Sequence, residues 1–297
     1  MRLRFDQLGK QIGKEALTPS GLTIAHDEIA HDAQQADLRH EPDPSREAER
    51  VRLGLLGRFA ATVCLIELYG HPPDKDEVLA CVGKLIAFRQ KRVRLARART
   101  TSAPFAEPFL WIIAAGRPTT VLAELGTLPA PDWPAGVYLA PSLLRTGLVV
   151  ASELPRERST VLVRLMVAGP LLSRAIADLS ALPADAHERA FAEPILLNLR
   201  HVLGTEPTRT SEEQEFIVTM QEYWKQARQE LLDAGRDAGR AEEAARAVLT
   251  VLRVRGIAVP DSARERILAQ KDPSLLERWH EKAIVASSIT EVLDEPS

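Results

Sequence analysis

Three acidic residues stand in three different predicted elements, and together they have the chemistry to hold a metal ion. Glu15 falls in a predicted helix, Asp37 in a predicted strand, and Glu67 at the end of a later apolar strand. Magnesium prefers hard oxygen ligands and usually takes one or two carboxylates together with water and phosphate oxygens. A metal ion held in this way activates water and stabilises the charge that develops when a phosphodiester bond is cleaved. We therefore predict that Asp37 and Glu67 bind magnesium and that Glu15 assists them.

The placement of Glu15 depends on the helix predicted over residues 3–17. Phe5, Leu8 and Ile12 follow one another at helical spacing and form an apolar stripe. Glu15 comes three residues after Ile12, so the spacing predicts that it lies on this stripe, where a carboxylate needs a partner or a metal ion. Alternatively, the last turn of the helix leaves the core and Glu15 reaches water.

A basic segment follows Glu67 along the chain. Residues 78–106 contain no Asp or Glu, whereas they carry several Lys and Arg residues. A basic helix end beside a metal site suits the phosphate backbone of a nucleic acid. We predict that four of these residues contact DNA: Arg89, Lys91, Arg92 and Arg94. The alternative is a solvated helix end whose positive charges complement the helix dipole.

Hydrophobic periodicity predicts mixed helices and strands in the first part of the chain and helices alone in the last third. The predicted strands or extended segments span residues 22–33, 34–41, 62–68, 108–116, 135–140 and 146–154. The predicted helices span residues 3–17, 45–61 and 76–99, and nearly everything after residue 159 is predicted to be helical. This pattern indicates an α/β domain followed by a helical region.

A segment rich in Pro, Thr and Glu, GTEPTRTSEE at residues 204–213, is predicted to be a linker between two parts of the chain. Residues 1–203 would form the α/β domain with helical additions, and residues 214–297 a helical C-terminal region. Three large residues lie four apart on a long polar helix of that region: Phe216, Met220 and Trp224. This spacing is typical of a packing seam, and it also allows a homodimer contact through the C-terminal helices.

Composition restricts the possible compartments and partners. The formal net charge is −3, so any binding to nucleic acid must come from a local basic patch. Cys64 and Cys81 both lie in apolar runs and are predicted to be buried free thiols of a reducing compartment. The beginning of the sequence lacks the apolar core of a signal peptide, and charges interrupt the longest apolar stretch. We therefore expect a cytoplasmic protein with no membrane association.

Several other chemistries find no support in the sequence. There is no G-x-S-x-G context for a serine hydrolase, no phosphate-binding loop and no dinucleotide glycine fingerprint. The segment AHDEIAHDA at residues 25–33 places His26 and His31 five residues apart. This differs from the H-E-x-x-H spacing of zinc proteases, so a polar hairpin edge is favoured over a zinc site.

Four segments share a pattern with a known group of nucleases. FDQLGKQIGKEAL resembles its first helix, and DAQQADLRHEPDP resembles the strand that carries its first metal-binding aspartate. TVCLIELYGHPPDKDEVLACVGKLIAF resembles the strand with the second acid and the helix after it. Residues 246–293 resemble the helical region that often follows. On these segments the chain resembles the PD-(D/E)XK nuclease-like superfamily, and within it the recombination-promoting nuclease or transposase group.

The resemblance implies a restriction-endonuclease-like mixed sheet flanked by helices, with an all-helical C-terminal extension. It also implies a magnesium-dependent DNA endonuclease linked to recombination or mobile elements. In such an enzyme Asp37 and Glu67 would bind the metal ion, and Glu15 would hold a water molecule beside it.

The sequence departs from the superfamily pattern just after Glu67. The superfamily has a catalytic Lys or Gln two residues after the second acid, where this chain has Tyr69. A tyrosine cannot supply the positive charge that lysine contributes near the transition state. Either a lysine of the following helix takes this role, with Lys84 and Lys91 as candidates, or the domain has lost catalysis. In the second case it would act as a DNA-binding or protein-interaction module.

Overall fold

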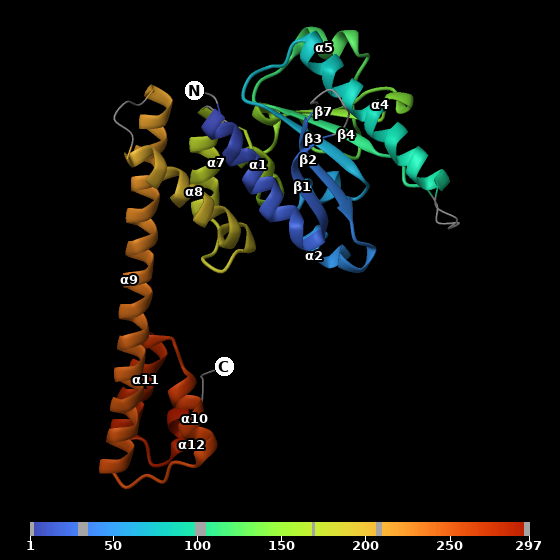
Figure 1. Cartoon of the computed structure of the whole chain (residues 1–297). Helices are drawn as coiled ribbons and strands as arrows, with labels where there is room; N and C mark the ends of the chain where they lie inside the picture. Colours follow the sequence, from blue (N-terminus) through green and yellow to red (C-terminus); the bar gives the residue numbers. More distant parts are fainter. Residues whose placement is uncertain (1–2, 29–34, 99–104, 168–169, 206–209, 294–297) are drawn as a thin grey trace. The chain divides into compact units, whose positions relative to one another are not determined.

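The computed structural model describes residues 3–28, 35–98, 105–167, 170–205 and 210–293, and the chain divides into two compact units (Figure 1). The first unit extends from Met1 to Tyr223 and the second from Trp224 to Ser297. The division therefore lies later than the predicted linker at 204–213, and inside a long helix. Large apolar side chains at the start of that helix are buried in the first unit: Phe216, Met220 and Tyr223. Phe216 and Met220 of the predicted seam therefore pack within the first unit, whereas Trp224 is only partly buried.

The first unit is built on a mixed sheet, which confirms the predicted α/β class. Its strand order among the described residues is β1-β2-β3-β4-β7-β6-β5. β1, β2 and β3 are antiparallel, β3, β4 and β7 are parallel, and β5 and β6 extend the other edge as antiparallel strands. The strands are β1 (Gly21–Glu28), β2 (Gln35–Pro42), β3 (Cys64–Tyr69), β4 (Phe109–Ala114), β5 (Leu128–Pro129), β6 (Val137–Leu139) and β7 (Thr146–Val150).

Helices flank the sheet and continue alone after the last strand. Those of the first unit are α1 (Leu3–Leu17), α2 (Glu47–Val51), α3 (Leu55–Phe59), α4 (Lys75–Ala98), α5 (Thr119–Glu124), α6 (Val161–Leu165), α7 (Pro170–Ser180) and α8 (His187–Thr205). The long helix α9 (Ser211–Val254) begins in the first unit and ends in the second. Within the described residues, no helix combines the length and the apolar character that crossing a membrane requires.

Helices α1 and α4 cover opposite faces of the sheet (Figure 1). Successive residues of a strand point to opposite faces. On one face of β3, Leu65 packs with the buried side chains of α4. On the other face, Leu68 lies against Gly9 of α1, where an added Cβ would come within 3.0 Å of its side chain. The strands therefore lie between two helices, each of which can send a side chain to the end of β3.

The helix predicted over residues 45–61 is two short helices instead. α2 and α3 are separated by a turn at Gly54, which has a φ of 58°. An added Cβ there would lie 2.4 Å from the carbonyl oxygen of Ser159. The positive φ and the close backbone approach both require glycine, and this interrupts the helix that the periodicity predicts.

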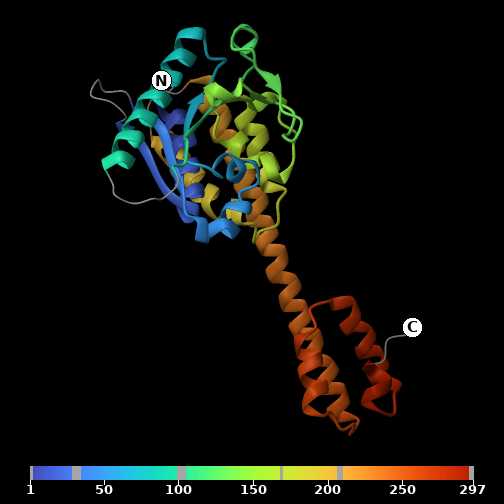
Figure 2. The same ribbon diagram turned by 90° about the vertical axis from the view of Figure 1, so that its right-hand side faces the viewer.

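The second unit is helical, as the sequence predicted for the C-terminal region. Its helices after α9 are α10 (Asp261–Ala269), α11 (Pro273–Val285) and α12 (Ile289–Leu293). Figure 2 shows them beside the C-terminal part of α9. Trp279 of α11 is 1% exposed and lies in a separate core with Val248, Leu252, Ile267 and Leu276. The unit thus has its own apolar centre.

Candidate active site

The pairing of β2 with β3 brings two predicted metal ligands together. The two strands are antiparallel, and Leu38 is the partner of Ile66. This is the last pair of the two strands, and Asp37 and Glu67 are the next residue on each strand. Oδ2 of Asp37 accepts a hydrogen bond of 2.8 Å from the backbone N–H of Leu68. The Asp37 carboxylate therefore lies beside the backbone at the end of β3, next to Glu67.

Glu67 is a buried carboxylate with one engaged and one unengaged oxygen. Its side chain is 3% exposed, and Nζ of Lys84 lies 2.9 Å from its Oε2. Among the described residues, no hydrogen-bond donor reaches its buried Oε1. Burial raises the pKa of Glu67 to about 7, and the charge of Asp37 adds to the rise, while Lys84 and Lys10 oppose it. An unsatisfied buried oxygen costs free energy unless a proton or a cation is close to it.

The fold of α4 explains how Lys84 reaches the sheet. Asp74 and Glu77 form a capping box at its start, because the backbone N–H of each donates to the side chain of the other. Cys81 and Phe88 of α4 are buried, and Lys84 lies between them at spacings of three and four residues, on the same helix face. Lys84 therefore occupies a position that packing would otherwise give to an apolar residue.

Tyr69, the residue at the superfamily's lysine position, has a different partner. Its hydroxyl lies 3.1 Å from Sγ of Cys81. Burial raises the pKa of Tyr69, with Cys81 and nearby carboxylates adding to the rise. Tyr69 consequently stays neutral and supplies no positive charge. The positive charge beside the Glu67 carboxylate comes from the ammonium group of Lys84 instead.

Lys10 is a site residue that the sequence reasoning missed. Its Nζ lies 2.7 Å from Oδ1 of Asp37, and its side chain is 11% exposed. The sequence holds a signal for this position, because Lys10 is three residues before Gly13 and seven before Leu17, both of which are buried. The apolar stripe considered at first left out the glycines, which have no side chain to show that they face the core.

The expected inward placement of Glu15 is not what the structure shows. Glu15 is exposed at the last turn of α1, which matches the alternative in which it reaches water. The predicted stripe of Phe5, Leu8 and Ile12 is buried, and the buried face also includes Gly9 and Gly13, where an added Cβ would meet neighbouring atoms closer than 3.0 Å. Glu15 lies beyond one edge of this face, so it does not join the carboxylate cluster.

Two of the four predicted DNA contacts are used within the chain. Arg89 forms two hydrogen bonds of 2.7 Å to the carboxylate of Glu107. Arg92 pairs with Glu41 at 3.1 Å and its guanidinium lies over the ring of Phe88. The sequence could not show this, because both acidic partners lie outside the basic segment.

The other two predicted DNA contacts differ from Arg89 and Arg92. Within the described part of the chain, Lys91 and Arg94 have no acidic partner within ion-pair distance, and Arg94 is exposed on α4. They lie toward the C-terminal end of the helix that carries Lys84. The basic surface of this helix is thus smaller than the sequence suggests.

The cluster of Lys10, Asp37, Glu67 and Lys84 has a donor set that fits magnesium. Within the described residues, no group of three or more His, Cys, Asp or Glu side chains is placed to hold a metal ion. Magnesium is commonly bound through one or two carboxylates, with water and substrate phosphates completing its octahedron. Asp37 and Glu67 supply two hard carboxylates, and the unengaged Oε1 of Glu67 is a ready ligand atom.

The remaining motifs are the two cysteines and the two histidines. Cys64 and Cys81 are buried free thiols, as predicted, and burial raises the pKa of each to about 12. These thiols are therefore poor nucleophiles and poor metal ligands at neutral pH. The segment with the two histidines considered for zinc falls partly outside the described structure, which leaves out His31 and the side chain of His26.

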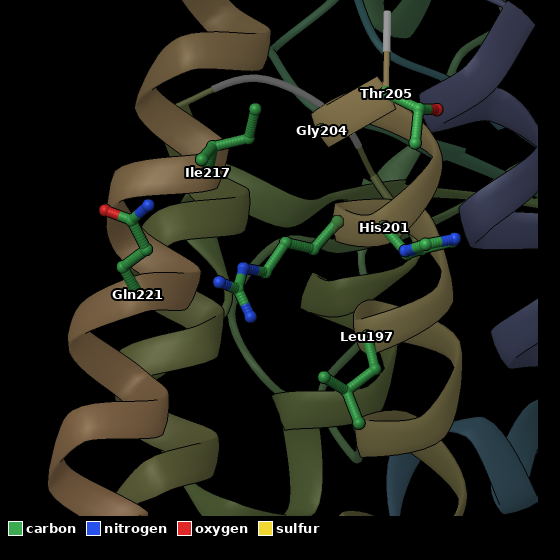
Figure 3. A pocket seen from close by; sticks show the side chains of 7 residues that line it. Leu197, His201, Gly204, Thr205, Ile217 and Gln221 are labelled. Carbon is green, nitrogen blue, oxygen red and sulfur yellow. The ribbon is translucent and has the colours of Figure 1, made fainter.

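A groove of about 550 Å³ lies elsewhere in the first unit, along α8 and the start of α9 (Figure 3). Its lining residues are Leu197, Arg200, His201, Gly204, Thr205, Ile217 and Gln221. None of the predicted catalytic or nucleic-acid-binding residues lines it. The groove is therefore a feature distinct from the carboxylate cluster.

Comparisons with protein-family models, with curated proteins and with solved structures find no match to this chain. The function is therefore inferred from the geometry of the cluster.

Proposed function

We propose that the cluster formed by Lys10, Asp37, Glu67 and Lys84 is the active site of a magnesium-dependent DNA endonuclease. One observation carries the proposal. Two carboxylates from paired strands lie together at the end of β3, with a lysine ammonium 2.9 Å from one of them and an unengaged oxygen on the same carboxylate. The order of elements α1-β1-β2-β3-α4-β4 supports a restriction-endonuclease-like fold, since it sets Asp37 and Glu67 in the two strands that the resemblance requires.

Each residue has a role that follows from its position. Asp37 and Glu67 would hold the magnesium ion, which supplies Lewis-acid charge and lowers the pKa of water when it is bound. Lys84 replaces the strand lysine from the opposite helix. Its ammonium group orients a nucleophilic water and offsets negative charge at the scissile phosphate. Lys91 and Arg94, on the same helix, contact the phosphate backbone of DNA.

The proposal is tested by cleavage of supercoiled plasmid DNA with the full chain, in magnesium or in manganese. We expect wild-type protein to nick or cut the plasmid, and Asp37→Asn and Glu67→Gln to lose the activity. Lys84→Met should lose about 10²-fold in rate, the size of effect expected when one charge-stabilising donor is removed. Two exposed positions serve as matched controls, because Glu15→Gln and Lys75→Met should keep wild-type activity.

A second candidate function is a catalytically inactive nuclease-like domain that binds DNA or another protein. It is favoured by one observation, since each carboxylate of the cluster already has a lysine within ion-pair distance. Such a domain would not cleave DNA in either metal, and its affinity for DNA, followed by fluorescence anisotropy, would not depend on Asp37 or Glu67. Cleavage that is equal in wild type and Asp37→Asn would indicate a contaminating nuclease and would contradict our proposal.

A further inference from the structure

The two carboxylates of the cluster are neutralised in unequal ways. Glu67 has a lysine on one oxygen, and its other oxygen has no donor among the described residues. Both oxygens of Asp37 are engaged, because Oδ1 lies 2.7 Å from Nζ of Lys10 and Oδ2 accepts from the backbone N–H of Leu68. Glu67 therefore offers a divalent cation one unengaged oxygen, whereas at Asp37 the cation meets the ammonium group of Lys10.

The burial of Lys10 makes this contact strong. The lysine is 9% exposed as a whole residue, in a helix that lies close to the sheet at Gly9 and Gly13. Opposite charges interact far more strongly at a partly buried site than in water, and salt screens them less. An ammonium group at this distance from Oδ1 therefore holds the carboxylate in place and also repels any other cation from it.

Lys84 does not compete in the same way. It contacts Oε2 of Glu67 and leaves Oε1 available, so lysine and metal ion can use different oxygens of one carboxylate. Lys10 faces a carboxylate with no such spare oxygen. The two lysines therefore have different consequences for metal binding, although they look alike in the sequence.

We propose that Lys10 is a positioning residue that acts as a built-in counter-cation for Asp37 and competes with a divalent metal ion for it. The inference rests on the proposed function, because it takes Asp37 as a metal ligand. In metal-free protein Lys10 holds the Asp37 carboxylate at the end of β3. When a divalent cation binds, its attraction for Asp37 must exceed that of Lys10, so the lysine lowers metal affinity while it keeps the empty site folded.

The test is a titration of full-length protein with Mn²⁺, followed by calorimetry. Lys10→Gln removes the charge and keeps a hydrogen-bond donor of similar length. We expect it to bind Mn²⁺ about tenfold more tightly than wild type. Lys10→Arg keeps the charge and should bind like wild type. Lys14→Gln, at an exposed lysine of the same helix, is the matched control and should leave affinity unchanged.

A second readout separates competition from a merely structural role. In chelator, Lys10→Gln should unfold at a lower temperature than wild type, because Asp37 loses its partner. Saturating Mn²⁺ should raise the unfolding temperature of Lys10→Gln more than that of wild type. Asp37→Asn combined with Lys10→Gln should abolish the gain in affinity.

Two other outcomes would contradict the role of Lys10, and they differ in what they imply for the proposed function. Equal or weaker Mn²⁺ binding by Lys10→Gln, with clear binding by wild type, would overturn the role of Lys10 and leave the proposed function standing. If neither protein binds Mn²⁺ while both are folded, the metal site itself is wrong, and the proposed function fails together with the inference.

Discussion

The surroundings of Glu67 change the pH at which its carboxyl group releases a proton. Burial and the neighbouring Asp37 raise its pKa from 4.5 to about 7. An acid whose pKa is higher in the folded state keeps its proton over a range where the unfolded chain has released it. The contribution of Glu67 to folding stability therefore falls as pH rises through the window from 4.5 to about 7, and it is lowest above that window.

This predicts how Glu67→Gln differs from wild type as pH changes. In chelator, the free energy of unfolding of wild type should fall by about 2 kcal/mol relative to Glu67→Gln between pH 5 and pH 8. Urea unfolding at several pH values measures the difference, and the other titrating groups cancel between the two proteins. Glu15→Gln, at an exposed carboxylate, should show no such trend. A difference that stays constant over this range would contradict the raised pKa.

At the scale of elements, α1 packs closely at a glycine against the backbone that follows α6. A Cβ at Gly9 would lie 2.0 Å from the carbonyl oxygen of Met166, which is backbone and cannot turn aside. Gly83, in α4, is a matched comparison, because a Cβ added there would have no atom within 4 Å. Packing therefore requires glycine at position 9, whereas position 83 has room for a larger side chain.

We expect Gly9→Ala and Gly83→Ala to change stability in opposite directions. Gly9→Ala should lower the free energy of unfolding by about 1–3 kcal/mol, because backbone must move to admit the methyl group. Gly83→Ala should raise it by up to about 1 kcal/mol, since alanine is the better helix former. Denaturant melts of the two variants beside wild type measure both effects. A stabilising Gly9→Ala would mean that α1 is not tightly packed here.

The same helix shows how far the sequence alone could lead. The order of helices and strands around β2, β3 and α4 followed from periodicity, and it placed Asp37 and Glu67 in two different strands. That these strands are neighbours is seen only in the structure. Lys10 and Glu15 could not be placed correctly from apolar spacing, because the close contact is made at Gly9 and Gly13. Apolar periodicity is read from apolar side chains, so it did not show that the buried face of α1 extends to the two glycines.

Charges on α4 were harder to predict for another reason. The sequence shows that Arg89 is basic, but its partner Glu107 is brought to it only by the path of the chain into β4. Lys84 was placed from its spacing to buried neighbours, which a helix fixes locally. Spacing along a helix could therefore predict that Lys84 points inward. The ion-pair partner of Arg89 depends on tertiary structure, so the sequence did not predict it.

At the scale of the whole molecule, the two units have separate apolar cores. The core of the first unit gathers around β3, β4 and α4, and that of the second around Trp279 and Leu276. Cores that share no residue give each unit its own stability. Only α9 contributes residues to both units.

We predict two unfolding transitions in calorimetry, each sensitive to its own core. Leu276→Ala should lower one transition, with a loss of about 2–5 kcal/mol for a fully buried leucine. Leu65→Ala should lower the other by a similar amount, and each is the control for the other. Joint movement of both transitions in either variant would show that α9 couples the units into one cooperative structure.

The arrangement of the four charges has a consequence for how the molecule assembles. Lys10 and Asp37 come from α1 and β2, whereas Glu67 and Lys84 come from β3 and α4, so each ion pair lies within its own contiguous stretch of chain. Asp37 and Glu67 meet only when β2 pairs with β3, and each stretch of chain brings one lysine to the shared site. The repulsion between the two carboxylates is therefore offset from both sides of the junction, because neither stretch supplies both lysines.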